Sequence, residues 1–502
     1  MLAFGSWEPD KADYQNPGAT IAQNVLSTTG SSYGPMPKLS SVVDALTERP
    51  RGAGAFRASD GTFATFAGDS GDLYKLNATA WDEISKSTGA YTVAAKDNWE
   101  FISYGNRVIC CNGHTDPIQS YVMLSSSDFA DLAAAAPRAK HIAVINNFVM
   151  TGNTWDSTDG SVPNRVWWSS IDDPTTWPTI GSSAAAQAQS DRQDLPSGGK
   201  VQAITGAVGG ADGAVFMDKS IYRVSYEGAP LVFSFTEVER GRGAFIANSV
   251  VNVGPFAAYI GEDGFFLFDG SQSQPIGAQK VDEFFFDDLD FNYIDRVSSG
   301  ADPVKKQIYW SYPSVTLGST GEPDTLIVYN WETQRWTYGK QSCYTLFSEI
   351  TKSYTLEQLN SFGNVDTITT SFDSRIWIEG QLVLSGFDAN FKLASFAGGA
   401  LPATMTTTEV GGMELFTKPN ERLYVDGVRP YVDGGTYTAS LVYRDSPSGS
   451  VSTDGPNSVD TDGMANFTRS CRYARIQIDI AEDALWSHAQ GVDLAVTEDG
   501  EF

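Results

Sequence analysis

Histidine, the most versatile catalytic side chain near neutral pH, is scarce in this 502-residue chain. The three histidines, His114, His141 and His488, are far apart in the sequence. A histidine-based nucleophile system needs a hydroxyl or thiol, a base and an orienting acid brought together. No local pattern around the three supplies such a set. We therefore expect each histidine to have a structural role.

Motifs for phosphate or peptide chemistry are also missing. Gly209-Gly210 and Gly241-Arg242-Gly243 lack the Lys-Ser/Thr pair that completes a phosphate-binding loop. The sequence contains no HExxH motif. We predict that the chain is not an enzyme, with no catalytic residue, no bound cofactor and no metal site.

The four cysteines show no metal-binding or disulfide pattern. Cys110, Cys111, Cys343 and Cys471 contain no CxxC pair, so the sequence indicates neither a zinc site nor a disulfide framework. Neighbouring Cys110 and Cys111 would point to opposite faces of a strand. We expect buried free thiols, as in a reducing compartment.

The stretch from Val281 to Phe291 mixes phenylalanines with five carboxylates. Clustered carboxylates could bind a cation, but the spaced glycine and oxygen ligands of a calcium loop are missing. An acidic amphipathic helix is the favoured interpretation.

One phrase could indicate an enzyme. Ser170-Ile171-Asp172-Asp173-Pro174-Thr175-Thr176-Trp177 resembles the Asp-box of sialidase-type propellers, with Pro174 in place of a glycine, and residues 155–160 are a looser echo. In that family the box stabilises a turn far from the catalytic site, so it favours propeller architecture. Tryptophans could stack on sugars, although core packing is the favoured role for each candidate: Trp167, Trp168, Trp331 and Trp336.

Composition favours short strands over long helices. Aromatic residues make up 12% of the chain, with 48 glycines and 22 prolines. The formal charge is −27, which excludes binding to nucleic acid by neutralising its phosphates. The charge provides solubility through self-repulsion, or an acidic surface past which nucleic acid slides. Composition leaves both interpretations open.

A repeated phrase begins near Gly54: an apolar strand, a turn and an aromatic strand. The clearest hairpin is Phe256–Gly270, where Asp263-Gly264 lies between apolar runs. The recurrence every 40–60 residues or so is typical of propeller blades, and a chain of β-sandwiches is the alternative. Further units are 63–76, 107–113, a hairpin turning at 146–147, 213–224, 307–330, 375–380 and 391–396.

The organisation expected is all-β, with three parts. Residues 1–50 form an extended N-terminal arm, rich in aromatic residues and proline; residues 51–400 form a β-propeller-like domain; and residues 401–502 form a C-terminal β-sandwich. Within the second part, Gly181 to Lys200 is a polar run that predicts a long loop.

The first ten residues lack the basic and apolar regions of a signal peptide, and no segment reaches the ~18 apolar residues of a membrane span. We expect synthesis in the cytoplasm, with any extracellular role reached by assembly into a particle.

Several phrases together resemble the tail nozzle or hub proteins of short-tailed bacteriophages, also called packaged-DNA stabilisation proteins. The resemblance spans most of the chain, but its motifs are structural. They are Phe4-Gly5-x-Trp7-x-Pro9-Asp10, the Asn16-Pro17-Gly18 turn, Ala22-x-Asn24-Val25, the 32–39 phrase, 167–177 and Trp486–Asp493.

The resemblance implies a propeller-bearing subunit of the virion that forms a ring, expected to be a hexamer, below the portal and adaptor. Such a ring extends the DNA channel, retains packaged double-stranded DNA without sequence-specific binding, supports ejection and contacts other tail proteins. The aromatic arm would anchor to a neighbouring subunit. The alternative is a glycan-binding or glycan-cleaving β-propeller, and a secreted adhesin is a third, less favoured class.

Overall fold

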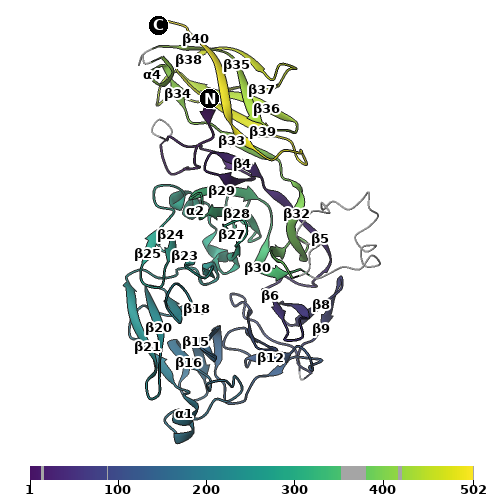
Figure 1. The fold of residues 1–502 in the computed structure, drawn as a ribbon, viewed down its shortest axis with the longest axis vertical. Helices are drawn as coiled ribbons and strands as arrows, with labels where there is room; N and C mark the ends of the chain where they lie inside the picture. Colours follow the sequence, from purple (N-terminus) through teal and green to yellow (C-terminus); the bar gives the residue numbers. More distant parts are fainter. Residues whose placement is uncertain (13–15, 88, 352–379, 417–420, 501–502) are drawn as a thin grey trace.

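The computed structural model describes residues 1–12, 16–87, 89–351, 380–416 and 421–500. Their regular secondary structure is almost entirely β-strand, as predicted. Figure 1 shows a ring of small sheets below a two-layered β unit, with the N-terminus lying within the upper unit. The fold is therefore a β-propeller joined to a β-sandwich.

Seven four-stranded units form the ring among the described residues. The first four are β6 (Gly52–Arg57), β7 (Phe63–Gly68), β8 (Leu73–Asn77), β9 (Ala80–Glu83); β10 (Glu100–Tyr104), β11 (Arg107–Cys111), β12 (Gln119–Val122), β13 (Ala130–Asp131); β14 (Arg138–Ile145), β15 (Phe148–Asp156), β16 (Gly160–Trp168), β17 (Arg192–Asp194); and β18 (Val201–Thr205), β19 (Gly213–Met217), β20 (Ser220–Gly228), β21 (Val232–Arg240).

The remaining three units complete the circle. They are β22 (Val251–Asn252), β23 (Ala257–Gly261), β24 (Gly264–Phe268), β25 (Ser273–Pro275); β26 (Ser298–Asp302), β27 (Gln307–Pro313), β28 (Pro323–Asn330), β29 (Arg335–Lys340); and β30 (Tyr344–Ile350), β31 (Leu382–Phe387), β32 (Lys392–Ala400), β5 (Pro37–Ala45).

The first strands of the blades line the propeller axis. β6, β10, β14 and β18 contact one another in turn, as do β22, β26, β30 and again β6. Blades four and five are joined by the short helix η2 (Ala247–Ser249) and by a hydrogen bond from Gly209 N to Gly254 O (3.0 Å). The last blade takes β5 from before the first blade, with Leu39 opposite Phe396. This pairing closes the ring, which leaves only short blade edges for solvent to reach.

The predicted hairpins are present, with one shift. Asn146 and Asn147 form the turn between β14 and β15 at φ 45° and 63°, the left-handed region that asparagine tolerates. In the β23–β24 hairpin the turn is Glu262-Asp263, since Gly261 pairs with Gly264. The Asp-Gly pair was predicted as the turn itself, but only its glycine has a positive φ, at 142°.

The polar run from Gly181 to Lys200 was predicted to be a long loop, but it contains regular structure. It contains α1 (Ser183–Ala188), with Ser182 as its N-cap, and β17, which forms the outer edge of the third blade. An outermost strand faces solvent, so its sequence lacks an apolar pattern. The strand predicted at 375–380 lies outside the described residues except for Gly380.

The sandwich consists of two layers. One contains β1 (Leu2–Ala3), β3 (Val25–Thr29), β4 (Ser32–Pro35), β35 (Leu423–Val432), β38 (Ala465–Cys471) and β40 (Ala489–Glu498). The other contains β33 (Ala403–Thr406), β34 (Val410–Gly411), β36 (Tyr437–Arg444), β37 (Ser452–Ser458) and β39 (Tyr473–Ile480), with the short helix α4 (Gly412–Phe416) following β34.

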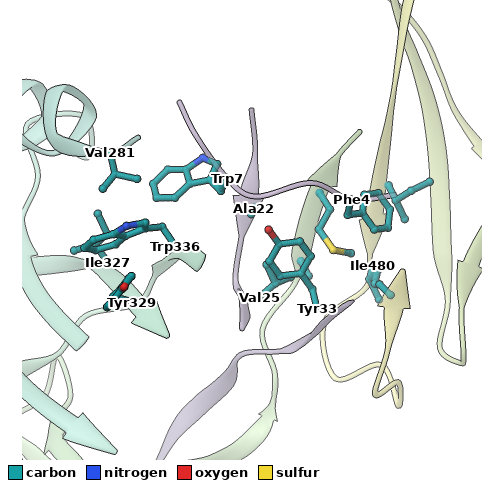
Figure 2. Packing of buried hydrophobic residues seen from close by; sticks show 14 of the residues in the cluster. Phe4, Trp7, Ala22, Val25, Tyr33, Val281, Ile327, Tyr329, Trp336 and Ile480 are labelled. Carbon is teal, nitrogen blue, oxygen red and sulfur yellow. The ribbon is translucent and has the colours of Figure 1, made fainter. Parts of the chain in front are cut away.

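The N-terminal arm links the propeller and the sandwich through one continuous sheet. β2 (Ala22–Gln23) pairs with β29 of the sixth blade on one side and with β33 of the sandwich on the other. Figure 2 shows Phe4, Trp7 and Tyr33 lying between propeller and sandwich residues. All three are fully buried in one hydrophobic core with Trp336 and Ile480. These aromatic residues thus pack within their own chain, which corrects the prediction that they anchor the arm to a neighbour.

Candidate functional site at the propeller axis

Two adjoining cavities open at the propeller axis, where the inner strands begin. They have volumes of about 290 and 320 Å³. Both are lined by Asn98, Glu100, Ala247, Asn248 and Asp295, which come from three different blade junctions. Propeller axes are common places for ligand sites because many loops converge there.

Hydrogen bonds join three of the residues that line both cavities. Asn98, which precedes β10, donates from Nδ2 to the carbonyl oxygen of Asp295 (3.0 Å). Asn248, which lies in η2, donates to the same oxygen (3.1 Å). Asp295 belongs to η3 (Phe291–Arg296), immediately before blade six. These bonds link three blade junctions beside the two cavities.

The axis carries positive charge in an otherwise acidic molecule. Six lysine and arginine side chains line the two cavities against three acidic ones, an excess of three positive charges, whereas the whole chain carries −27. The basic residues are Arg49, Arg51, Lys96, Lys140, Lys200 and Arg296, and the acidic ones are Asp97, Glu100 and Asp295.

Three of these cations, Arg49, Arg51 and Arg296, share the smaller cavity. Burial, together with the charges of Arg296 and Arg51, lowers the pKa of Arg49 to about 10. Arg51 Nη1 donates to the carbonyl oxygens of Val93 (3.2 Å) and Ala94 (2.6 Å). Such an arrangement concentrates positive charge in a hollow and is suited to an oxyanion.

The larger cavity has a more balanced polar lining. His141 Nδ1 lies 2.6 Å from Glu100 Oε1, and Glu100 Oε2 also accepts from the backbone N–H of Ile142 (3.0 Å). Lys140 forms an ion pair with Asp97 at 2.5 Å. Glu100 is therefore engaged by its own neighbours, which makes it a poor candidate for acid–base chemistry.

The other two histidines have structural surroundings. His114 Nε2 lies 2.7 Å from the carbonyl oxygen of Asn153, and its Nδ1 is 3.4 Å from Ser161 Oγ, a long contact. Burial lowers the pKa of His114. The backbone N–H of His488 donates to Asp433 Oδ1 (2.9 Å). Neither histidine lines the axial cavities.

The cysteines are buried and free, as predicted. Cys110 packs in the cluster that holds Phe66 and Trp99, whereas Cys111 packs in the cluster that holds Ile142 and Trp167. The two side chains therefore point to opposite faces of β11, each toward a neighbouring blade. Burial raises the pKa of both thiols well above its ordinary value.

The Asp-box-like phrase forms a closed turn after β16, away from the axis. Asp173 accepts hydrogen bonds from the hydroxyls of Thr175 (2.7 Å) and Thr176 (2.6 Å), which lower the pKa of its carboxyl. Trp177 Nε1 donates to the carbonyl oxygen of Pro174 (2.9 Å). The phrase stabilises a turn, as interpreted from the sequence.

The tryptophans proposed for sugar stacking contribute mainly to the core. Trp167, Trp168 and Trp336 are buried, and Trp331 packs edge-to-face on Phe256 with 5.8 Å between ring centroids.

The acidic stretch forms helix α2 (Asp282–Asp288), as expected, with Phe285 in the core. Across the described ranges, no group of three or more histidine, cysteine, aspartate or glutamate side chains is arranged to hold a metal ion. Within the same ranges, no helix is both long and apolar enough to span a bilayer.

Sequence reasoning did not identify the arginine cluster. Arg49 and Arg51 flank Pro50, a spacing that could have been noticed, but Arg296 is distant in the sequence and only ring closure brings it near.

Comparisons with known proteins give fold-level likenesses only. No protein-family model and no curated protein matches the chain. The extracellular domain of a hybrid two-component system from B. thetaiotaomicron is 11% identical at a TM-score of 0.39, and the match covers 90% of this chain and 47% of that chain. This chain thus spans about half the length of that relative.

Two further solved structures are similar over most of their own length. The Neurospora crassa Pan2 WD40 domain is 7% identical at a TM-score of 0.39, covering 72% of this chain and 95% of that one. Apo AztD from Citrobacter koseri is 14% identical at a TM-score of 0.31, covering 68% and 95%. At such values the likenesses carry no inference about activity or partners.

Proposed function

We propose that this chain is a structural subunit of a short bacteriophage tail. It assembles into a ring below the portal and adaptor. The resemblance to tail nozzle proteins implies that this ring is a hexamer. The ring extends the DNA channel of the virion, retains packaged DNA and supports ejection. The chain acts by assembly and catalyses no reaction.

The observation that carries the proposal is the core shared by the propeller, the arm and the sandwich. Pairing of β2 with both β29 and β33 makes one sheet run through the junction. Trp7 stacks on Tyr338 of the propeller, with ring centroids 4.7 Å apart, and its Nε1 donates to the carbonyl oxygen of Thr20 (3.1 Å). A large apolar junction resists domain motion, which a ring subunit under mechanical stress requires.

The charge of the chain agrees with this role. A net charge of −27 repels the phosphates of duplex DNA and favours passage without binding. In this proposal the DNA channel lies between subunits, at the centre of the ring.

Mass photometry of the full chain, alone and mixed with the adaptor of the same phage, tests the proposal. We expect a ring-sized species, visible as closed rings by negative-stain microscopy, with adaptor alone as the control. Monomer in every mixture would contradict it. Mass spectrometry of purified virions should also detect the chain.

A glycan-binding propeller is the second candidate, and one observation favours it. A cavity of about 570 Å³ between blades two and three is lined by Trp155, Trp167 and Trp177. However, the guanidinium of Arg138 lies over Trp155 (4.5 Å) and that of Arg192 over Trp167 (5.1 Å), so a sugar must displace them to stack. A glycan array and a hydrolysis screen that are both blank would remove this candidate.

A further inference from the structure

The arginines at the propeller axis lack the partners that arginines have elsewhere in the chain. Among the described residues, Arg49 forms neither an ion pair nor a hydrogen bond through its side chain, and neither Arg51 nor Arg296 forms an ion pair. Arg296 Nε is buried and has no hydrogen-bond acceptor. Three arginines thus line one cavity together with two carboxylates, Glu100 and Asp295, and none of the three forms an ion pair with either.

This absence is unusual because acidic residues outnumber basic ones, 61 to 34. Away from the axis, Arg165 pairs with Asp156, Asp159 and Asp194, at distances of 2.6–3.2 Å. Buried charges are normally paired since desolvation disfavours a lone ion. With three arginines against two carboxylates and no ion pair between them, the cavity retains a net positive charge available to an external anion.

The cluster is also positioned in advance. Two carbonyl oxygens hold Arg51, and Arg296 donates to the carbonyl oxygen of Gly321 and lies over the ring of Tyr293 at 4.4 Å. Arg49 enters from the segment between β5 and the first blade. Guanidinium groups fixed in this way bind carboxylate or phosphate through paired N–H donors at little cost in side-chain entropy.

We propose that the cavity lined by Arg49, Arg51 and Arg296 is a binding site for a small oxyanion, a carboxylate or phosphate carried on a molecule of about monosaccharide size. The cavity volume of about 290 Å³ limits the ligand to this size. Asn98 and Asn248 close one side of the cavity through their bonds to Asp295. The site lies within one subunit, so its occupancy does not depend on ring assembly.

Isothermal titration calorimetry of the full chain with glucose 6-phosphate, glucuronate and glucose tests the site. We expect saturable binding of at least one anionic sugar and none of glucose. Arg49→Gln should weaken binding about tenfold or more, equivalent to at least 1.4 kcal/mol. Arg49→Lys, which keeps the charge but loses the paired donors, should give an intermediate affinity. Arg57→Gln, an exposed change at the opposite end of β6 from the cavity, should have no effect.

Thermal unfolding supplies an independent readout. Without ligand, Arg49→Gln should melt at or above the wild-type temperature, because it removes repulsion from a folded chain. The anionic sugar should raise the melting temperature of the wild type but not that of the variant. Equal affinity in the wild type, Arg49→Gln and Arg296→Gln would overturn the proposal, as would no saturation by either anion at about 1 mM.

Discussion

At the residue scale, Asp282 is a buried carboxyl whose surroundings disfavour its charge. Burial, with repulsion from Asp10 and Asp263, raises the pKa of Asp282 from 3.8 to about 7, despite a hydrogen bond from the N–H of Phe265 (3.1 Å). The folded state therefore holds this proton more tightly than the unfolded state. Its contribution to stability is present below pH 3.8 and is lost as pH rises to about 7.

Asp282→Asn should remove this loss, because asparagine stays neutral and its Oδ1 still accepts from Phe265. Above pH 7 we expect the variant to be more stable than the wild type by about 2 kcal/mol, after a discount for partial exposure. Urea unfolding at pH 5 and pH 8 measures the difference. Glu262→Gln, in the same exposed turn, is the control because Glu262 is not among the charges that raise the pKa of Asp282. Parallel pH profiles for wild type and Asp282→Asn would disprove the assignment.

Predictions for single residues were accurate where the surroundings of a side chain depend only on its position within one strand. The opposite faces of Cys110 and Cys111 follow from the period of a β-strand, and both faces proved buried. The arginine cluster was beyond reach because Arg296 comes near Arg49 only when the ring closes. The bridge from Asn98 to Asp295 spans 197 positions in the sequence, and no local pattern predicts it.

At the element scale, β5 holds the ring closed. Val43 is 8% exposed and packs with Tyr74 of the first blade and Leu393 of the last. Val43→Asp places an unpaired carboxylate in this contact, and we expect a loss of roughly 3–5 kcal/mol. Hydrogen exchange should increase first in β5 and β32.

Val43→Thr is the matched control for this closure because it keeps the shape and adds only a neutral hydroxyl. It should cost about 1 kcal/mol. If hydrogen-exchange protection of β5 is the same in Val43→Asp as in the wild type, the last blade closes without this strand.

Sequence patterns predicted hairpins well and blade edges poorly. The β14–β15 and β19–β20 hairpins carry apolar strands around polar turns. β17 and β5 are outer strands, and β5 joins a blade whose other strands lie more than 300 residues later. Outer strands are half solvated, so their composition is close to that of loops. The blade count therefore came from the structure.

The arm is the element on which the junction depends. Trp7 is fully buried, stacks on Tyr338 and meets Phe284 edge-on with 4.9 Å between centroids. Trp7→Ala should lower the unfolding free energy by about 3–5 kcal/mol. Limited proteolysis should then separate propeller from sandwich.

Leu485→Ala is the control in the same part of the molecule, because Leu485 is 89% exposed. Such surface substitutions change the unfolding free energy by no more than about 0.5 kcal/mol. If Trp7→Ala unfolds like the wild type and resists the protease, the arm does not stabilise the junction.

At the scale of the whole molecule, a charge of −27 opposes any assembly of identical copies. Salt screens this repulsion, because the Debye length falls from about 14 Å at 0.05 M to about 4 Å at 0.5 M. We expect the second virial coefficient from static light scattering to be positive at low salt and to fall as sodium chloride rises. The ring fraction measured by mass photometry should rise over the same range.

This dependence separates apolar from ionic subunit contacts. If rings form through apolar surfaces, screening removes only the opposing charge and assembly strengthens. If ion pairs between subunits hold the ring, salt weakens them and the ring fraction falls. Sucrose at matched osmolality controls for solvent exclusion. A ring that dissociates as salt rises would contradict the view that the acidic surface opposes assembly, and would instead place complementary charges at the subunit boundary.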